Sequence, residues 1–155
     1  MEITEILSLE AVVPSLKATS KKQLLQELAA RAARITGEPE RKIFDVLLER
    51  ERLGTTGVGN GVAIPHGRLP GLKRLYGLFV RMDEAVAFDA IDDAPIDLVF
   101  LLLAPDVAGA DHLKALARVS RLLRDRGICE KLRASESRDA LYAILTEPTT
   151  SSQAA

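Results

Sequence analysis

The sequence predicts one α/β domain in which a single mixed β-sheet is flanked by helices on both faces. Residues 96–103 are almost all apolar, which is typical of a central strand covered on both sides. Several flanking segments instead repeat apolar side chains at helical spacing. The chain has 155 residues, of which 47% are hydrophobic and 28% charged, as expected of one globular domain. We assign residues 1–148 to this domain and expect residues 149–155 to be a disordered tail.

The N-terminal third contains one clear helix. Ser20 is a common N-cap residue, and Gln23 completes a capping box, so we expect a helix over residues 21–36. Before this helix, the sequence pattern indicates secondary structure less clearly. Residues 3–7 fit a short helix, and residues 12–17 fit a strand that is interrupted by a proline.

A second helix is expected to have Pro39 in its first turn and to end near Leu53, before Gly54. The apolar stripe of this helix consists of Ile43, Val46 and Leu47. Arg50 occupies the next position on the stripe, in the last helical turn. Its side chain can reach water and the helix C-terminal dipole, or it can point toward the residues after Gly54 as part of a site. The spacing leaves both interpretations open.

The following stretch, residues 54–67, reads GTTGVGNGVAIPHG. Its glycines permit positive φ angles, and successive N–H groups there can form a concave site for an anion. Residues 62–64 fit a short buried strand, which Pro65 would end stiffly. His66 is therefore expected at a strand end with little backbone freedom, where a neutral imidazole can act as a base, a ligand or a nucleophile.

This glycine pattern differs from the known nucleotide-binding motifs. A Rossmann fingerprint follows a strand and opens a helix, whereas this pattern follows a helix and precedes a strand. A P-loop requires Gly-Lys followed by Ser or Thr, and the sequence lacks that triplet. A Ser-His-Asp hydrolase is also disfavoured, because no serine lies in a nucleophile elbow.

The second half of the chain continues with strands and helices. Strands are expected over residues 75–82 and 96–103, joined by a turn-rich link at residues 89–95. Ser137 caps the last helix and Pro148 ends it. The expected helices of this half cover residues 112–125, 127–134 and 138–145.

His112 lies in the first turn of the helix that Asp111 or a neighbour is expected to cap. It shares the inner stripe of that helix with Leu116, Val119 and Leu123. The helix N-terminus disfavours a charged imidazolium, so a neutral His112 could donate a hydrogen bond to another imidazole or to phosphate. A half-buried structural histidine is the alternative. Both histidines and Arg50 lie at element ends on otherwise apolar faces, which favours a shared site.

Composition excludes several functional classes. The net charge of −1 gives no general argument for binding nucleic acid. A single cysteine excludes an internal disulfide and favours a reducing, cytoplasmic location. Acidic residues stand where a signal peptide needs basic ones, and the longest apolar run is too short for membrane insertion.

No metal site is expected, because two distant histidines and one cysteine provide no zinc spacing. The acidic residues between positions 83 and 93 are expected in solvated turns. A solvated helix face is expected for Arg118, Arg121 and Arg124.

The segment LLERERLGTTGVGNGVAIPHGRLPGL strongly resembles the active-site region of phosphotransferase-system IIA domains of the fructose/mannitol type, with the nitrogen-related branch most similar. The resemblance continues through AFDAIDDAPIDLVFLLLAP and DHLKALARVSRLL and covers nearly the whole chain. It implies that His66 is phosphorylated through Nε2, that His112 stabilises the phosphoryl group, and that Arg50 is the active-site arginine. The candidate phosphate-binding amides are those of Gly57, Gly59, Asn60 and Gly61.

The resemblance implies a phosphotransferase that works through protein contacts. The expected phosphoryl donor is a histidine-phosphocarrier protein of the nitrogen branch. The expected output is regulation of nitrogen, carbon or potassium physiology, with potassium transport or sensor proteins as candidate targets. No cofactor is expected, because a donor that already carries phosphohistidine makes metal and ATP unnecessary.

Two alternatives stay open. The first is a sugar-specific IIA component that passes phosphate to a IIB protein during fructose or mannitol uptake. Asn60 counts against it, because mannitol-type relatives carry glutamate there. The chain also lacks IIB, membrane-embedded IIC and fused phosphocarrier domains, as expected of a standalone regulatory form. The second alternative is a binding module without chemistry, which the joint presence of His66, His112 and Arg50 disfavours.

Overall fold

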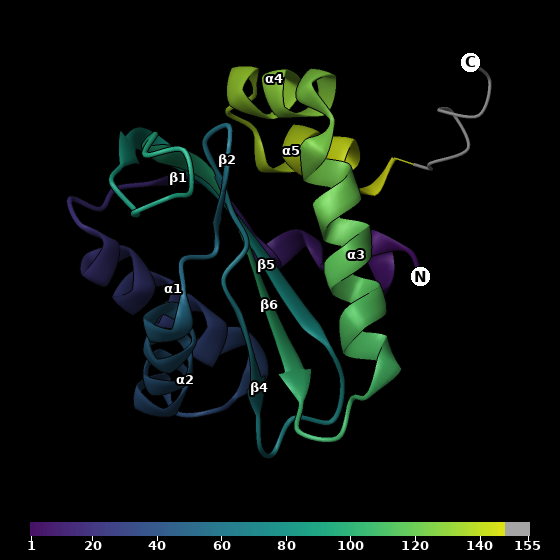
Figure 1. Ribbon diagram of the computed structural model, residues 1–155. Coiled ribbons are helices and arrows are strands. Elements are labelled where there is room, and N and C mark those ends of the chain that lie inside the picture. The colour runs from purple at the N-terminus through teal and green to yellow at the C-terminus, as the bar shows by residue number, and fades with distance from the viewer. Residues whose placement is uncertain (148–155) are drawn as a thin grey trace.

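The computed structural model describes residues 1–147 and has the predicted α/β architecture (Figure 1). Within these residues, one six-stranded mixed sheet is accompanied by five α-helices. Helices α1 and α2 lie on one side of the sheet, and α3, α4 and α5 lie on the other (Figure 1). Pro148, as a helix end, and the expected tail, residues 149–155, fall outside the described residues.

Strand β6 is the centre of the sheet. It pairs antiparallel with β5 and parallel with both β3 and β4, while β1 adds in parallel to β5. Strand β2 pairs antiparallel with β3. The strands are β1 (Val12–Leu16), β2 (Gly57–Gly59), β3 (Val62–Ala63), β4 (His66–Leu69), β5 (Tyr76–Val86) and β6 (Ile96–Pro105).

The predicted helices are present with small differences at their N-termini. They are α1 (Lys21–Thr36), α2 (Glu40–Leu53), α3 (Ala110–Arg124), α4 (Arg126–Ala134) and α5 (Arg138–Thr146), preceded by 3-10 turns at Ile3–Glu5 and Leu9–Ala11. Pro39 is the N-cap of α2 and not part of its first turn. Gly109 takes the N-cap position of α3, so Asp111 lies inside the first turn. Ser20 accepts from Gln23 N as predicted, but the Gln23 side chain accepts from Thr19 N instead of Ser20 N.

Two predictions about charged residues were wrong. Strand β5 extends to Val86, so Asp83 and Glu84 belong to a strand and not to a solvated turn. Arg118 is only 6% exposed, although it was expected on a solvated helix face. It lies three residues after Ala115 and four before Leu122, both buried, so helical periodicity places it on the inner face of α3.

The core forms around β6 and supports the segment that carries His66. Phe100 and Leu102 of β6 are fully buried, as are Ile43 of α2 and Val119 of α3. A strand covered by helices on both faces needs apolar side chains at nearly every position, and β6 has them. The fold therefore presents β4, at the side of β6, against a rigid support.

Candidate functional site

His66 lies where the strand pairing along β6 resumes after a break. Strand β3 pairs Ala63 with Val99, and β4 begins with the pairing of His66 and Leu102. Ile64 and Pro65 fill the break between them. Proline cannot donate to a strand ladder, but its carbonyl accepts from Leu102 N at 3.0 Å. The break therefore keeps the chain beside β6 while it frees Ile64 for another contact.

The carbonyl of Ile64 fixes the tautomer of His66. It lies 2.9 Å from His66 Nδ1. Because a carbonyl oxygen can only accept, Nδ1 carries the proton in the neutral ring and Nε2 keeps its lone pair. Burial lowers the pKa of His66, opposed by the hydrogen bond to Ile64, while the nearby Arg50 charge lowers it further and Glu51 raises it. The ring is therefore neutral near pH 7, with Nε2 as the nucleophilic atom.

Arg50 reaches His66 from the last turn of α2. Its Nε lies 3.3 Å from His66 Nε2, and its Nη1 donates to the carbonyl of Gly54 at 2.8 Å. The Arg50 side chain therefore makes both contacts considered from the sequence. It binds the C-terminal end of its own helix, and it points its guanidinium at His66. A guanidinium at this position can bind an anion attached to Nε2.

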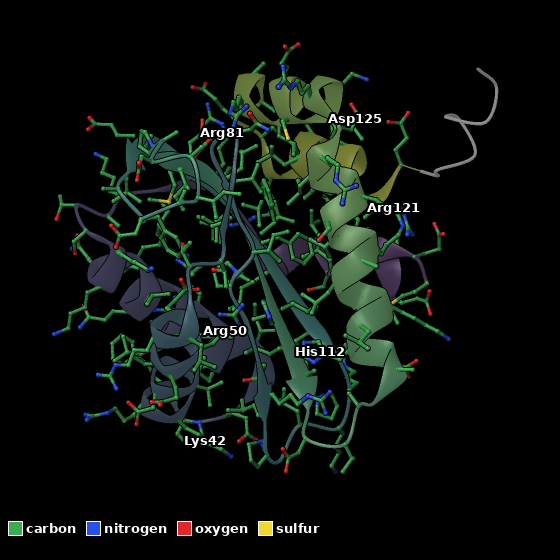
Figure 2. All side chains as sticks on the ribbon, viewed as in Figure 1. Lys42, Arg50, Arg81, His112, Arg121 and Asp125 are labelled. Atoms are coloured by element: carbon green, nitrogen blue, oxygen red, sulfur yellow. The ribbon has the colours of Figure 1, made fainter. Side chains whose placement is uncertain are left out.

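His112 approaches from the first turn of α3, on the other side of β4 from Arg50 (Figure 2). The His66 and His112 ring centroids are 5.9 Å apart, with 70° between the ring planes. His112 is 6% exposed, and its Nε2 is buried with no hydrogen-bond partner among residues 1–147. Burial lowers the pKa of His112, and the charges of His66 and Arg68 lower it further. A buried unpaired ring nitrogen is costly, which indicates a ligand atom as its partner.

The glycine-rich stretch forms a β-hairpin. Asn60 and Gly61 have φ angles of 58° and 79°, as a two-residue turn of type I′ requires. Asn60 N donates to Asp92, and Gly57 N donates to the Thr55 hydroxyl. Two of the four candidate phosphate-binding amides are thus already engaged within the protein. A phosphate role for Gly57, Gly59, Asn60 and Gly61 stays a prediction, and the chemistry proposed below relies on the side chains.

One buried charged residue of this region was missed by the sequence analysis. Glu51 is 8% exposed and accepts from Lys21 Nζ at 3.0 Å and from Thr56 N at 3.1 Å. The signal was present, because Glu51 follows the buried Leu47 by four residues, on the same helical face. The apolar stripe predicted for this helix from the sequence ended at Arg50.

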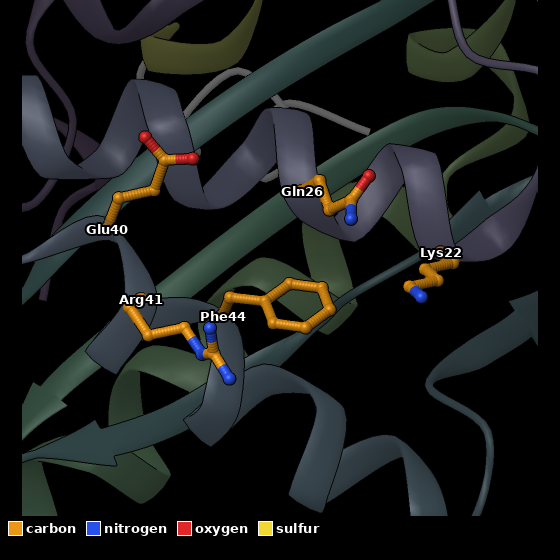
Figure 3. Close-up of a pocket in the computed structure, with 5 residues that line it drawn as sticks. All are labelled: Lys22, Gln26, Glu40, Arg41 and Phe44. Carbon is orange, nitrogen blue, oxygen red and sulfur yellow. The ribbon is translucent and has the colours of Figure 1, made fainter.

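A surface pocket of about 470 Å³ lies away from this site, between α1 and α2 (Figure 3). It is lined by Lys22, Gln26, Glu40, Arg41 and Phe44. Its charged side chains are exposed and of both signs.

Two further observations concern the described part of the chain. Residues 1–147 contain no cluster of three or more His, Cys, Asp or Glu side chains arranged to hold a metal ion. None of the helices in this range has the length and apolar character needed to cross a bilayer.

The chain matches the family model described as "Phosphoenolpyruvate-dependent sugar phosphotransferase system, EIIA 2" over residues 5–147. It is 60% identical over 148 residues to a nitrogen regulatory protein of Bradyrhizobium diazoefficiens, covering 96% of this chain and 97% of the relative. It is 37% identical over 143 residues to a fructose-specific EIIA component of Haloferax volcanii, with 92% and 90% covered. The crystal structure of nitrogen regulatory protein IIA-Ntr from Neisseria meningitidis superposes with a TM-score of 0.88 at 40% identity, covering 93% of this chain and 99% of that one.

Proposed function

Because the chain belongs to the EIIA 2 family of the phosphoenolpyruvate-dependent sugar phosphotransferase system, we propose that it is a phosphocarrier that accepts a phosphoryl group on His66. One observation carries the proposal. Ile64 O holds the proton of His66 on Nδ1, so the Nε2 lone pair faces a guanidinium donor, Arg50 Nε. Nε2 is therefore a neutral nitrogen nucleophile, and Arg50 Nε moves from its lone pair to the phosphoryl oxygens as Nε2 attacks phosphorus in line.

The transfer step balances without an external acid or base. His66 Nε2 attacks the phosphorus of a donor phosphohistidine, a new N–P bond forms, and the old N–P bond breaks with its electron pair returning to the donor nitrogen. The His66 Nδ1 proton stays on its bond to Ile64 O. Arg50 and the unpaired Nε2 of His112 are the donors for the phosphoryl oxygens, which carry the charge of the transition state.

The phosphoryl donor in this proposal is a histidine-phosphocarrier protein of the nitrogen branch. The relative from Bradyrhizobium diazoefficiens carries the name nitrogen regulatory protein and shares 60% of its residues with this chain. We therefore assign a regulatory output, in which the phosphorylation state of His66 controls contacts with target proteins in the cytoplasm. Potassium transport or sensor proteins are the candidate targets.

A sugar-transport role is the second candidate, supported by the 37% identity to a fructose-specific EIIA component. In that case the phosphoryl group on His66 would move on to a IIB protein. The same site chemistry serves both roles, so the two differ in their partners and not in the geometry around His66.

A phosphotransfer assay tests the proposal. The full chain is mixed with phosphoenolpyruvate, enzyme I and the histidine phosphocarrier of the nitrogen branch, in parallel with the sugar-branch proteins. Intact mass reports the adduct, and acid lability identifies it as phosphohistidine. We expect an acid-labile adduct that forms faster with the nitrogen-branch donors. Faster labelling by the sugar-branch donors would favour the transport role.

The His66→Ala variant identifies the acceptor. It should give no adduct, while its thermal unfolding transition stays close to that of the unmodified protein, because the ring is only half-buried. An adduct on this variant would remove His66 from the role. His112→Ala provides the matched histidine deletion, which should still be labelled.

A further inference from the structure

An ion pair between the buried Glu51 and the partly exposed Lys21 adjoins the site. The carboxylate of Glu51 binds Lys21 Nζ at 3.0 Å, and it accepts from both the backbone N and the hydroxyl of Thr56. The ammonium of Lys21 also lies 4.4 Å from the centre of the Phe88 ring. Buried ion pairs add little net stability, because removing the charges from water is expensive. A pair in this position therefore points to a role in geometry.

A continuous path of hydrogen bonds leads from this pair to the nucleophile. Glu51 binds Thr56, and the Thr56 carbonyl accepts from Ile64 N at 3.0 Å. The Ile64 carbonyl then accepts from His66 Nδ1 at 2.9 Å. On the helix side, Glu51 directly follows Arg50, whose Nε reaches the other ring nitrogen of His66. The hydrogen bond from Arg50 Nε to the imidazole thus depends on how α2 is fixed against the segment from Thr56 to His66.

We propose that Glu51, held by Lys21, is the positioning residue that fixes the end of α2 against this segment and so aligns Arg50 Nε with His66 Nε2. The inference rests on the proposed phosphocarrier function and deepens it. Glu51 touches neither the phosphoryl group nor the partner, and acts through Thr56 and through its neighbour on the helix. Lys21, from the first turn of α1, makes a third element part of the arrangement.

The charges around His66 give this arrangement a measurable signature. Arg50 and Glu51 face it from α2, His112 faces it from α3, and Arg68 follows it on β4. Glu51 is the anion of this group and raises the pKa of His66. Lys21 partly neutralises Glu51 and must therefore weaken that effect. If Glu51 acted by its charge alone, changes at the two ends of the ion pair would move the pKa of His66 in opposite directions. Loss of the Arg50 alignment instead raises that pKa in both variants, because the Arg50 charge lowers it more than Glu51 raises it.

The first test is an NMR titration of the His66 imidazole in the full-length protein. Glu51→Gln releases the end of α2, so the larger effect of the Arg50 charge on the pKa of His66 is lost together with that of the Glu51 charge, and the pKa should shift upward. Lys21→Met keeps the apolar stem, leaves Glu51 without its cation, and should shift the pKa of His66 upward. Glu49→Gln, at an exposed position of the same helix that pairs only with Arg52, is the matched control and should leave the pKa unchanged.

A purely electrostatic role would produce opposite shifts in the two folded variants. A downward shift in Glu51→Gln, or a His66 pKa that neither variant changes, would overturn the proposal. Using both variants keeps the test decisive if one of them folds poorly.

The second test is the rate of phosphotransfer to His66. A misaligned nucleophile loses much of the rate gain that comes from correct orientation, so Glu51→Gln should slow transfer by about tenfold or more. Glu49→Gln should be labelled at the rate of the unmodified protein. Labelling of Glu51→Gln at that same rate would also contradict the proposal. If no donor labels the unmodified protein, the phosphocarrier function fails, whereas the NMR titration still decides whether Glu51 and Lys21 control His66.

Discussion

Two hydrogen bonds contact opposite ring nitrogens of His66. Ile64 O holds the proton at Nδ1, and Arg50 Nε meets the lone pair at Nε2. The first bond decides which nitrogen is nucleophilic, and the second places a cation where a phosphoryl group would sit. Each depends on a different neighbour, so the imidazole is oriented by the backbone just before its strand and by the end of α2.

The pH dependence of transfer follows from the lowered pKa of His66. Because burial disfavours the imidazolium, the nucleophilic neutral ring persists below the ordinary pKa of 6.5. We expect the single-turnover labelling rate to fall with acid along a curve whose midpoint lies below pH 6.5. Stopped-flow quench measurements with excess donor would check this. A rate that already halves at pH 6.5 would show that the pKa is not lowered.

His112 gives a second prediction at the scale of one residue. Replacing it with alanine removes one donor to the phosphoryl oxygens and leaves His66 and Arg50 in place. Losing one such donor should slow transfer by roughly a hundredfold without abolishing it. The Tm should fall modestly, because deletion of the buried ring leaves a cavity but breaks no hydrogen bond of Nε2 among the described residues. Transfer at the original rate would make His112 a structural residue.

The three site side chains could be proposed from the sequence because each one breaks a pattern. Arg50 and His112 occupy apolar stripes, and His66 follows a proline after glycines. Glu51 breaks the same stripe one residue later, but its meaning depends on Lys21, which lies in another helix. Partners that are distant in the sequence leave no local signal, so the ion pair could be found only from the structure.

At the scale of elements, α2 packs against β4 through a glycine. An added methyl group at Gly67 would collide with Val46 Cγ1 of α2. Gly67 follows His66 directly, so this contact sets how closely the helix carrying Arg50 approaches the strand carrying the nucleophile. The glycine is needed here for close approach, and not for an unusual backbone angle.

Gly67→Ala should therefore affect stability and transfer together. Overpacking of this kind costs about 1–3 kcal/mol, which corresponds to a fall in Tm of roughly 2–12 °C for a chain of this size. Calorimetry and the labelling assay would measure the two effects. Adding Val46→Ala removes the colliding methyl group and should restore a large part of both. A double variant no better than Gly67→Ala would show that the two elements do not meet through this contact.

The helices were predictable because caps and stripes mark them locally, as with Ser20 at the start of α1. Strands β2 and β4 were not predicted. They have three and four residues and exist because they pair with β3 and β6, respectively. Strand β5 also includes Asp83 and Glu84, and their exposed acidic side chains are not typical of a strand, so the sequence did not predict one there. Pairing between strands overrides composition in β2 and β4.

For the whole molecule, both histidines link stability to pH. Burial lowers each pKa below its ordinary value of 6.5, so the unfolded chain binds more protons than the folded one as the pH falls toward the lowered values. The free energy of unfolding must then increase with pH in this range. The contribution is present above about pH 6.5 and is lost as the pH falls through the folded pKa values.

Urea titrations between pH 7.5 and pH 5.5 would measure this slope. The carboxylates titrate mostly below this range, with ordinary pKa values of about 4. A double variant with His66→Ala and His112→Ala should lose most of the dependence. Equal slopes for both proteins would mean that the histidines titrate alike in the folded and unfolded states.

The position of the site between two layers has a further consequence. Arg50 and His112 come from helices on opposite sides of the sheet (Figure 1). A phosphoryl group on His66, held by both side chains, would act as a removable cross-link between those layers. Phosphorylation would restrict local unfolding at the C-terminus of α2 and the N-terminus of α3. Loss of the phosphoryl group would allow that unfolding again. A partner protein could then distinguish the two states by the rigidity of the surface around the histidine, as well as by its charge.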